Sequence, residues 1–362
     1  MKPYRVGILG ATGMVGQRFI TLLSEHPWFS IRMLAASSKS SGMPYFEAIK
    51  DRWVMESPIP PDIQNMPVYD LDTDAEKIAR EVDFVFCAVN MDQEATRTLE
   101  ERYAKLECPV ISNNSAHRWT NDVPMVIPEI NCDHLRLIEP QRKRLGTSRG
   151  FIAVKSNCSL QSYIPALHPL RQYGLRQILV CTYQAISGAG KTFSNWPEMI
   201  DNCIPYIAGE EEKSELEPLK IWGTIENQHL IPASTPSITA QCIRVPCSDG
   251  HLAACFVKFK EGEKPSTEQI ISDWNNYQGH PQNLKLPSAP KQLLHYFEEE
   301  NRPQTRFDRS LENGMGISIG RLRPDSQYDY KFVCLSHNTI RGAAGGAVLL
   351  AELLCAEGYI AH

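Results

Sequence analysis

A cysteine lies where a strand is expected to give way to a helix. Residues 150–155 have the pattern of a short strand, Cys158 follows within the sequence SNCS, and an apolar run from Leu160 to Leu167 comes next. A helix N-terminus favours negative charge, so a thiol here is expected to have a lowered pKa and to form a thiolate near neutral pH. Cys158 is therefore a candidate nucleophile. A buried structural thiol is the alternative, because the chain has eleven cysteines.

A histidine follows a turn further along the chain. His251 comes directly after the turn sequence SDG, between strands expected at Ser237–Val245 and Leu252–Lys260. A turn in front of a strand would place the imidazole at the strand end, a position suited to a general acid or base. Arg244 ends the preceding strand, and its planar fork matches a carboxylate. We expect the two side chains to share one cavity.

The same region raises a metal site as an alternative. Cys242, Cys247, His251 and Cys255 are closely spaced and are of metal-ligand types. Structural zinc sites, however, usually place ligands in pairs two to four residues apart, and the chain contains no CxxC pair. We therefore expect no metal.

A glycine-rich turn follows the first expected strand, Tyr4–Leu9. Residues 10–16 read GATGMVG, a GxxGxxG spacing rather than GxGxxG, and an amphipathic helical run follows. Such a turn lets backbone N–H groups and the helix dipole meet a pyrophosphate, although glycines that only make a tight turn are the alternative. The residues expected to bind a dinucleotide are Gly10, Thr12, Gly13, Met14 and Val15.

The second expected strand, Ile31–Ala35, distinguishes the two nicotinamide cofactors. NAD-binding proteins usually place Asp or Glu at its end to hold the ribose 2′-hydroxyl, and none is there. Hydroxyls around a lysine stand there instead, which suits a 2′-phosphate, so we expect NADP; a serine-rich connector without a ligand is the alternative. The residues concerned are Ser37, Ser38, Lys39 and Ser40.

The order of elements predicts an α/β architecture in two parts. Over the first 115 residues, short strand-like runs alternate with helical runs, the pattern of a doubly wound parallel sheet. Beyond residue 150, longer strands indicate an α+β domain, and a last helix rich in small residues, Gly342–Glu357, is expected to return to the first domain. We predict a Rossmann-type NADP-binding domain over 1–155, rejoined by 337–362, and a catalytic and dimerisation domain over 156–336.

Composition limits the class of partner. The chain has 362 residues, a net charge of −5 and dispersed basic residues, so neither nucleic acid nor a membrane surface is expected as partner. Scattered cysteines and no visible targeting segment indicate a cytoplasmic protein. An open sheet face in the second domain favours a homodimer or homotetramer acting on a small molecule.

Several short motifs occur together along nearly the whole chain. They are GATGMVG from residue 10, SNCS from 156, SGAG from 187, IPY from 204 with GEEEK from 209, RVP from 244 with DGH from 249, and HNT from 337 with RGAAG from 341. In this order the set resembles the aspartate-β-semialdehyde dehydrogenase family, in its archaeal and fungal-type branch.

The resemblance implies reversible, NADPH-dependent reductive dephosphorylation of L-aspartyl-4-phosphate to L-aspartate-4-semialdehyde, in lysine, threonine and methionine biosynthesis. Cys158 would form a thioester, His251 would act as acid and base, and Gln184 would orient the acyl group. Arg244 would bind the α-carboxylate and Glu210 the α-amino group. The remaining implied residues are Lys213, Asn113 and Arg118 for the phosphate, and Ser187, Gly188 and Asn338 beside the nicotinamide.

Three alternatives remain at this stage. Malonyl-CoA reductase resembles the family in scaffold and thioester chemistry, and N-acetylglutamyl-phosphate reductase fits the chemistry but matches the motifs less well. A non-catalytic NADP-sensing protein would keep the fold without the chemistry. Glu210 and Arg244 together favour an amino-acid substrate, since malonyl-CoA has a carboxylate but no amine.

Overall fold

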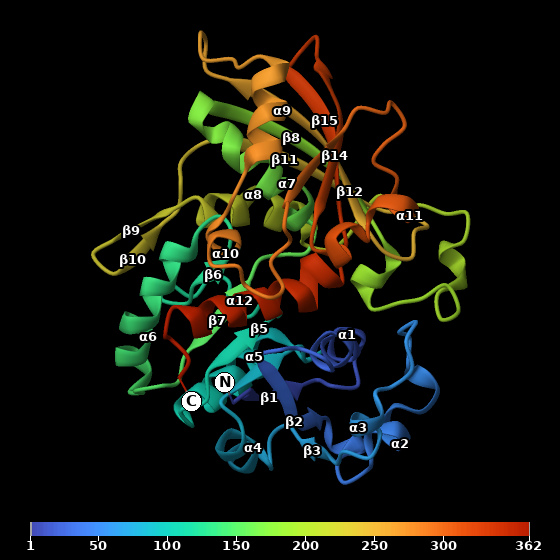
Figure 1. Cartoon of the computed structure of the whole chain (residues 1–362), viewed down its shortest axis with the longest axis vertical. Coiled ribbons are helices and arrows are strands. Elements are labelled where there is room, and N and C mark those ends of the chain that lie inside the picture. The colour runs from blue at the N-terminus through green and yellow to red at the C-terminus, as the bar shows by residue number, and fades with distance from the viewer. Residues whose placement is uncertain (1, 362) are drawn as a thin grey trace.

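The first of the two large sheets is parallel throughout. The computed structural model describes residues 2–361, and Figure 1 shows this sheet in the lower half of the molecule. Its strand order is β3-β2-β1-β4-β5-β7-β6, which is a doubly wound arrangement. The strands are β1 (Tyr4–Leu9), β2 (Phe29–Ala36), β3 (Val68–Asp70), β4 (Phe84–Cys87), β5 (Val110–Ser112), β6 (Met125–Val126) and β7 (Ile152–Lys155).

Helices cover both faces of this sheet, which explains its nearly continuous apolar strands. In β4, Phe84 and Phe86 pack with α1 and α12, whereas Val85 and Cys87 pack with α4 and α5. These helices are α1 (Met14–Leu23), α4 (Ala75–Glu81), α5 (Gln93–Lys105) and α12 (Gly345–Ala356); α2 (Tyr45–Ile49), α3 (Pro61–Gln64) and α6 (Ile138–Leu145) complete this part.

The second large sheet is mixed and has six strands, most of them longer than those of the first. Its order is β11-β8-β12-β15-β14-β13, with parallel pairs at both edges and antiparallel pairs in the centre. Its strands are β8 (Leu175–Gln184), β11 (Ser237–Arg244), β12 (His251–Phe259), β13 (Leu294–Phe297), β14 (Ile317–Pro324) and β15 (Tyr330–Ser336). The helices of this part are α7 (Leu160–Leu167), α8 (Glu210–Ile221), α9 (Thr267–Asn276), α10 (His280–Asn283) and α11 (Thr305–Asp308), and β9 (Thr224–Glu226) pairs with β10 (His229–Ile231) as a hairpin.

Only one face of the second sheet is fully covered. α7 and α9 pack on it through residues such as Ile164 and Trp274, which join the same core as Val180 and Phe332. On the opposite face, side chains of the two central strands remain half-buried. They are Leu179, Cys181, Tyr183, Leu252, Ala254 and Phe256.

The expected fold class is confirmed, including the return of the last helix. α12 packs with α1 and the parallel strands in one core, and it runs across the middle of Figure 1. The helix begins later than predicted, at Gly345, because Ala343 leaves the helical region with φ −140° and ψ −106° inside a π-type turn, Ile340–Ala344. The division at 155/156 stays a prediction. No helix within residues 2–361 is long and apolar enough to cross a bilayer.

Candidate active site

Cys158 lies between β7 and α7, as the sequence predicted. The side-chain oxygen of Asn157 accepts hydrogen bonds from the N–H and the hydroxyl of Ser159, both at 2.8 Å, and so fixes the turn that carries the cysteine. Cys158 itself remains partly exposed. Its Sγ lies 3.5 Å from Nε2 of His251, so the two predicted catalytic side chains, 93 residues apart in the chain, meet here.

His251 is buried, and its hydrogen bonds define the tautomer of the neutral ring. Its Nδ1 accepts the backbone N–H of Ala185 at 3.0 Å, which places the proton of the neutral ring on Nε2, the atom facing Cys158. Burial lowers the pKa of His251 to about 3, and the nearby Arg244 and His337 act in the same direction. The imidazole therefore stays neutral at physiological pH and offers an N–H to the sulfur.

The expected low thiol pKa is wrong for the free protein. Burial raises the pKa of the Cys158 thiol above its ordinary value, and Glu210 adds to this effect. The cations Lys155, Arg118 and Arg244 act in the opposite direction but do not outweigh burial. The sequence indicates the helix N-terminus but not how deeply the sulfur is buried, and burial is the dominant effect.

Four further predicted residues lie around this pair. Arg244 is buried and donates from Nη1 to the carbonyl oxygen of Ala185 at 2.7 Å. Glu210 receives the side-chain amides of Asn157 at 2.8 Å and of Gln184 at 3.2 Å, together with the ammonium of Lys213 at 3.0 Å. The site thus holds a guanidinium and a carboxylate close to the thiol.

The loop after β8 packs tightly on the site. A Cβ on Gly188 would stand 2.9 Å from Nη1 of Arg244 and 3.1 Å from the His251 ring, so only glycine fits there without displacement. Asn338 accepts the N–H of Gly250 at 2.7 Å and donates to the hydroxyl of Ser187 at 2.8 Å. Asn338 therefore joins this loop to the turn in front of His251.

The zinc alternative does not fit this geometry. His251 and Cys255 lie four residues apart on the extended strand β12, a separation of roughly 13 Å, too far for one ion. Cys242 instead contacts Ser214 at 3.7 Å. Within residues 2–361 no group of three His, Cys, Asp or Glu side chains is placed to hold a metal.

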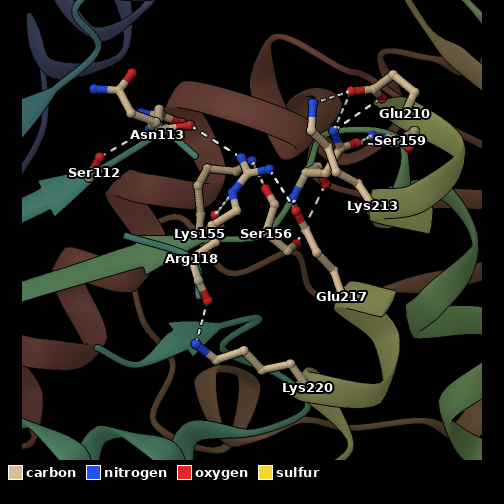
Figure 2. Close-up of polar contacts among 12 residues, drawn as sticks. Ser112, Asn113, Arg118, Lys155, Ser156, Ser159, Glu210, Lys213, Glu217 and Lys220 are labelled. Carbon is tan, nitrogen blue, oxygen red and sulfur yellow. Dashed lines mark hydrogen bonds and ion pairs between the residues drawn. The ribbon is translucent and has the colours of Figure 1, made fainter. Parts of the chain in front are cut away.

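Figure 2 shows a cluster of cations, and two of them, Lys155 and Arg118, act on the Cys158 thiol. Arg118 donates to the carboxylate of Glu217 at 2.9 Å and to the carbonyl oxygens of Lys155 at 3.2 Å and Asn113 at 3.3 Å. Arg118 and Lys213 also border a cavity of about 380 Å³ together with Ser115. Because each terminal guanidinium nitrogen has two N–H groups and uses one, Arg118 keeps two donors for an anion.

Asn113 has an unused buried amide. Its side-chain nitrogen and oxygen are both buried without a hydrogen-bond partner, and Figure 2 shows the amide directed away from Arg118. Such groups are rarely left unpaired in folded proteins, so this amide is a candidate ligand contact.

Sequence reasoning missed Lys155, Glu217 and Lys220. Lys155 is buried beside Cys158, its ammonium donates to the carbonyl oxygens of Ser156 and Gly342, and burial lowers its pKa to about 7. Lys220 donates to the carbonyl oxygen of Arg118. The spacing of Lys220 and Glu217 from Glu210 in one helix was the available signal.

The first strand, turn and helix form a cradle that fits a dinucleotide. Gly10 has φ +87°, and a Cβ there would stand 2.4 Å from the carbonyl oxygen of Ala88; on Gly16 it would stand 2.2 Å from that of Gly10. Gly13 precedes α1 without a side-chain cap, so backbone N–H groups of the first turn remain for an anion. Thr12, Met14 and Val15 belong to this turn and first helical turn.

The serine-rich segment lies next to this cradle, because β2 pairs with β1. Ser37, Ser38 and Lys39 are exposed at the end of β2, whereas Ser40 is buried. Exposed hydroxyls and an ammonium at this corner are suited to a phosphate on the adenosine ribose.

The fold and the site define the class of protein. Residues 5–138 match the semialdehyde dehydrogenase NAD binding domain, and residues 167–341 match the semialdehyde dehydrogenase dimerisation domain. The chain is 41% identical to the aspartate-semialdehyde dehydrogenase of Archaeoglobus fulgidus, covering 99% of each chain. It is also 41% identical to that of Schizosaccharomyces pombe, covering 99% of this chain and 100% of the relative. The chain belongs to the aspartate-semialdehyde dehydrogenase family.

Solved structures agree with this assignment. The aspartate-semialdehyde dehydrogenase of Candida albicans, solved with NADP, has a TM-score of 0.89 and 36% sequence identity over 99% of this chain and 100% of that one. Aspartate-semialdehyde dehydrogenase II of Vibrio cholerae, with a TM-score of 0.74 and 24% identity over 98% and 99%, shares the fold.

Proposed function

We propose that this chain catalyses the reversible, NADPH-dependent reduction of L-aspartyl-4-phosphate to L-aspartate-4-semialdehyde and phosphate, a step of aspartate-family amino-acid biosynthesis. The observation that carries the proposal is Sγ of Cys158 at 3.5 Å from Nε2 of His251, among groups suited to an amino acid and a phosphate. The names of the full-length relatives support the same reaction.

The first chemical step joins the acyl group to the protein. Sγ of Cys158 forms a bond to the acyl carbon, the bond from carbon to the phosphate oxygen breaks, and the thiol proton leaves with the phosphate. A thioester on Cys158 results, and this ester accepts hydride where a carboxylate would not. NADPH, when bound, supplies that hydride.

His251 acts as a neutral donor in this scheme. Its Nε2–H faces the sulfur and can donate a hydrogen bond to the oxygen that becomes negative when the acyl carbon is tetrahedral. When the aldehyde forms, the bond between carbon and sulfur breaks and the Cys158 thiolate takes up a proton from water. A ring whose Nδ1 already accepts a backbone N–H is better suited to donate than to take up a second proton.

The remaining side chains each bind a different group of the substrate. Arg244 offers its planar fork to the α-carboxylate, and Glu210 pairs with the α-ammonium group; Gln184, bonded to Glu210, orients the acyl group. Arg118 and Lys213, which border one cavity, bind the phosphate. The unpaired amide of Asn113 points away from Arg118, so it would join them only after a change of its side-chain rotamer.

The cradle of residues 10–16 would hold the pyrophosphate of NADP, and Ser37, Ser38 and Lys39 would hold its 2′-phosphate. The tight fit of Gly10 and Gly16, together with the uncapped start of α1, supports this placement. The NADP present in the Candida albicans relative agrees with the choice of cofactor.

The half-buried face of the second sheet supports a homodimer. It is the uncovered face of the segment that matches the dimerisation domain, and two copies packed through it would bury Leu179, Tyr183 and Phe256. We also place the protein in the cytoplasm, since all eleven cysteines are free thiols, as a reducing compartment keeps them.

The test is phosphate-dependent reduction of NADP⁺ by the purified protein. Aspartate semialdehyde should support turnover only when inorganic phosphate is present, and malonate semialdehyde with coenzyme A should not. Turnover with malonate semialdehyde and coenzyme A, and none with aspartate semialdehyde, would instead identify a malonyl-CoA reductase.

A further inference from the structure

The inner face of α8 carries four charged side chains in alternating sign. Glu210, Lys213, Glu217 and Lys220 follow one another at intervals of three, four and three residues, which places them on one side of the helix. The first two belong to the substrate site proposed above. Glu217 bonds to the backbone N–H of Asn157 and to Arg118, and Lys220 bonds to the carbonyl oxygen of Arg118; Figure 2 shows both contacts with Arg118.

Glu217 makes two bonds that join separate parts of the site. Its Oε1 accepts from Nη1 of Arg118 at 2.9 Å, and its Oε2 accepts the backbone N–H of Asn157 at 2.7 Å. Its side chain is 1% exposed, so water does not compete for either bond. One carboxylate thus connects the residue before Cys158 with Arg118, 39 positions earlier in the chain.

We propose that Glu217 is a positioning residue that sets the placement of Cys158 relative to the phosphate-binding fork of Arg118. This inference rests on the function proposed above. An acyl phosphate must be held at its phosphate while its carbon lies against the sulfur, and a misplacement of about 1 Å can cost on the order of a hundredfold in rate. Glu217 acts through the two groups and does not itself touch the substrate.

The remaining contacts of Arg118 explain why the carboxylate is needed. Two of its three bonds go to neutral carbonyl oxygens, of Lys155 and Asn113, and Glu217 is the charged acceptor of the three. Lys155 and Lys220 lie close by, and Glu217 raises the pKa of both ammonium groups while burial lowers it. Without Glu217, Arg118 would face other cations and would rotate away.

The experiment uses Glu217→Gln in the full-length protein. The amide oxygen can still accept the Asn157 N–H, but the amide NH₂ meets the Arg118 fork, so only the link to Arg118 is lost. We expect KM for inorganic phosphate, with aspartate semialdehyde and NADP⁺, to rise at least about tenfold, with a smaller change in KM for NADP⁺. We also expect phosphate to lose its protection of Cys158 against iodoacetamide, a readout independent of turnover.

The matched control is Glu352→Gln. Glu352 is also a buried carboxylate, bonded to His26 at 2.8 Å and to Ser288, but it lies outside the site. We expect this variant to keep the KM for phosphate even if its thermal stability falls. Glu217→Asp keeps the charge but is too short for both bonds, so it should show an intermediate KM.

Two results would overturn the inference. One is a KM for phosphate within twofold of wild type in Glu217→Gln, or in Glu217→Asp if the glutamine variant does not fold. The other is a rise in that KM equal to the rise in Glu352→Gln, which would assign Glu217 a merely structural role. Failure of the proposed function appears separately, because the wild-type protein would then show no phosphate-dependent turnover at all.

Discussion

At the scale of single residues, the site consists of a protonated sulfur facing a neutral imidazole. Burial raises the pKa of Cys158 and lowers that of His251 to about 3, so each group favours its uncharged form in the free protein. This differs from a preformed thiolate–imidazolium pair. The thiol is activated when an anionic substrate with its own proton acceptor, the departing phosphate, lies next to it.

This arrangement predicts the pH dependence of Cys158 alkylation. Because the thiol pKa is raised, the thiolate fraction should keep increasing from pH 6 to pH 9, by up to about tenfold per unit. The slope should lessen near pH 7, where Lys155, with a pKa of about 7, loses the charge that favours the thiolate. Iodoacetamide rates measured by peptide mapping test this. A plateau below pH 7, or a step near pH 6.5 from a titrating imidazole, would contradict it.

Single-residue chemistry was partly predictable from sequence. The turn in front of His251 and the strand that carries Arg244 indicated that these two side chains would share a cavity. Their meeting with Cys158, which follows β7 of the other sheet, was implied only by the family resemblance. The link made by Glu217 was not predictable, because its partners Arg118 and Asn157 lie 99 and 60 residues away in the chain. The prediction of a lowered pKa for the Cys158 thiol was wrong for a related reason, because burial depends on the tertiary packing.

At the scale of elements, the loop Ile186–Ala189 packs directly against the side chains of Arg244 and His251. Gly188→Ala should lower kcat/KM on the order of a hundredfold while leaving the fold intact, because the new Cβ displaces Arg244 and the His251 ring. Gly190→Asn is the matched control, since Gly190 has φ +67° with open space around it, and asparagine tolerates that backbone. Steady-state kinetics and thermal unfolding of both variants measure this. Equal losses of activity in the two would argue against the packing explanation.

The end of β2 should determine the cofactor preference. Lys39→Ala should raise KM for NADPH about tenfold and leave KM for NADH unchanged, since one charged hydrogen bond contributes about 1.5–3 kcal/mol. Lys143→Ala, another exposed lysine, serves as control and should change neither value. If Lys39→Ala affected both cofactors equally, this lysine would not contact a 2′-phosphate.

The elements that were predicted are those with a clear pattern. β1 lies at the expected residues, and α1 follows the glycine-rich turn as the amphipathic spacing indicated. β13 and the β9–β10 hairpin were not predicted. β13 is a four-residue edge strand whose parallel partner, β14, comes later in the chain, so nothing local in the sequence marks it.

At the scale of the whole molecule, the chain passes between the two large sheets twice, after β7 and after β15. α12 returns to the first core after β15 has completed the second sheet, so the first part consists of two separate stretches of chain and the second part lies between them. This return brings Asn338, between β15 and α12, against Ser187 and Gly250. The site is therefore built from both parts of the molecule. The order of motifs in the sequence indicated this, but it did not give the positions of the side chains relative to one another.

The open face of the second sheet should hold the dimer together. Phe256→Glu places a charge at the centre of that face and should shift the protein to monomers, measured by light scattering coupled to size-exclusion chromatography. Phe307→Glu is the control, because Phe307 is 69% exposed elsewhere on the molecule and should leave the assembly unchanged. A wild-type protein that is already monomeric, or a Phe256→Glu variant that remains dimeric, would place the interface elsewhere.

The most direct measurement of the central claim traps the acyl group on the protein. Wild-type protein mixed with aspartate semialdehyde and NADP⁺, without phosphate, should release NADPH in a burst equal to the number of sites and should carry an aspartyl thioester on Cys158 by mass spectrometry. Added phosphate should remove the adduct and restore turnover. Cys158→Ala should bind NADPH as the wild type does but show neither burst nor adduct. Turnover by Cys158→Ala, or a burst with the acyl group on another residue, would contradict the account.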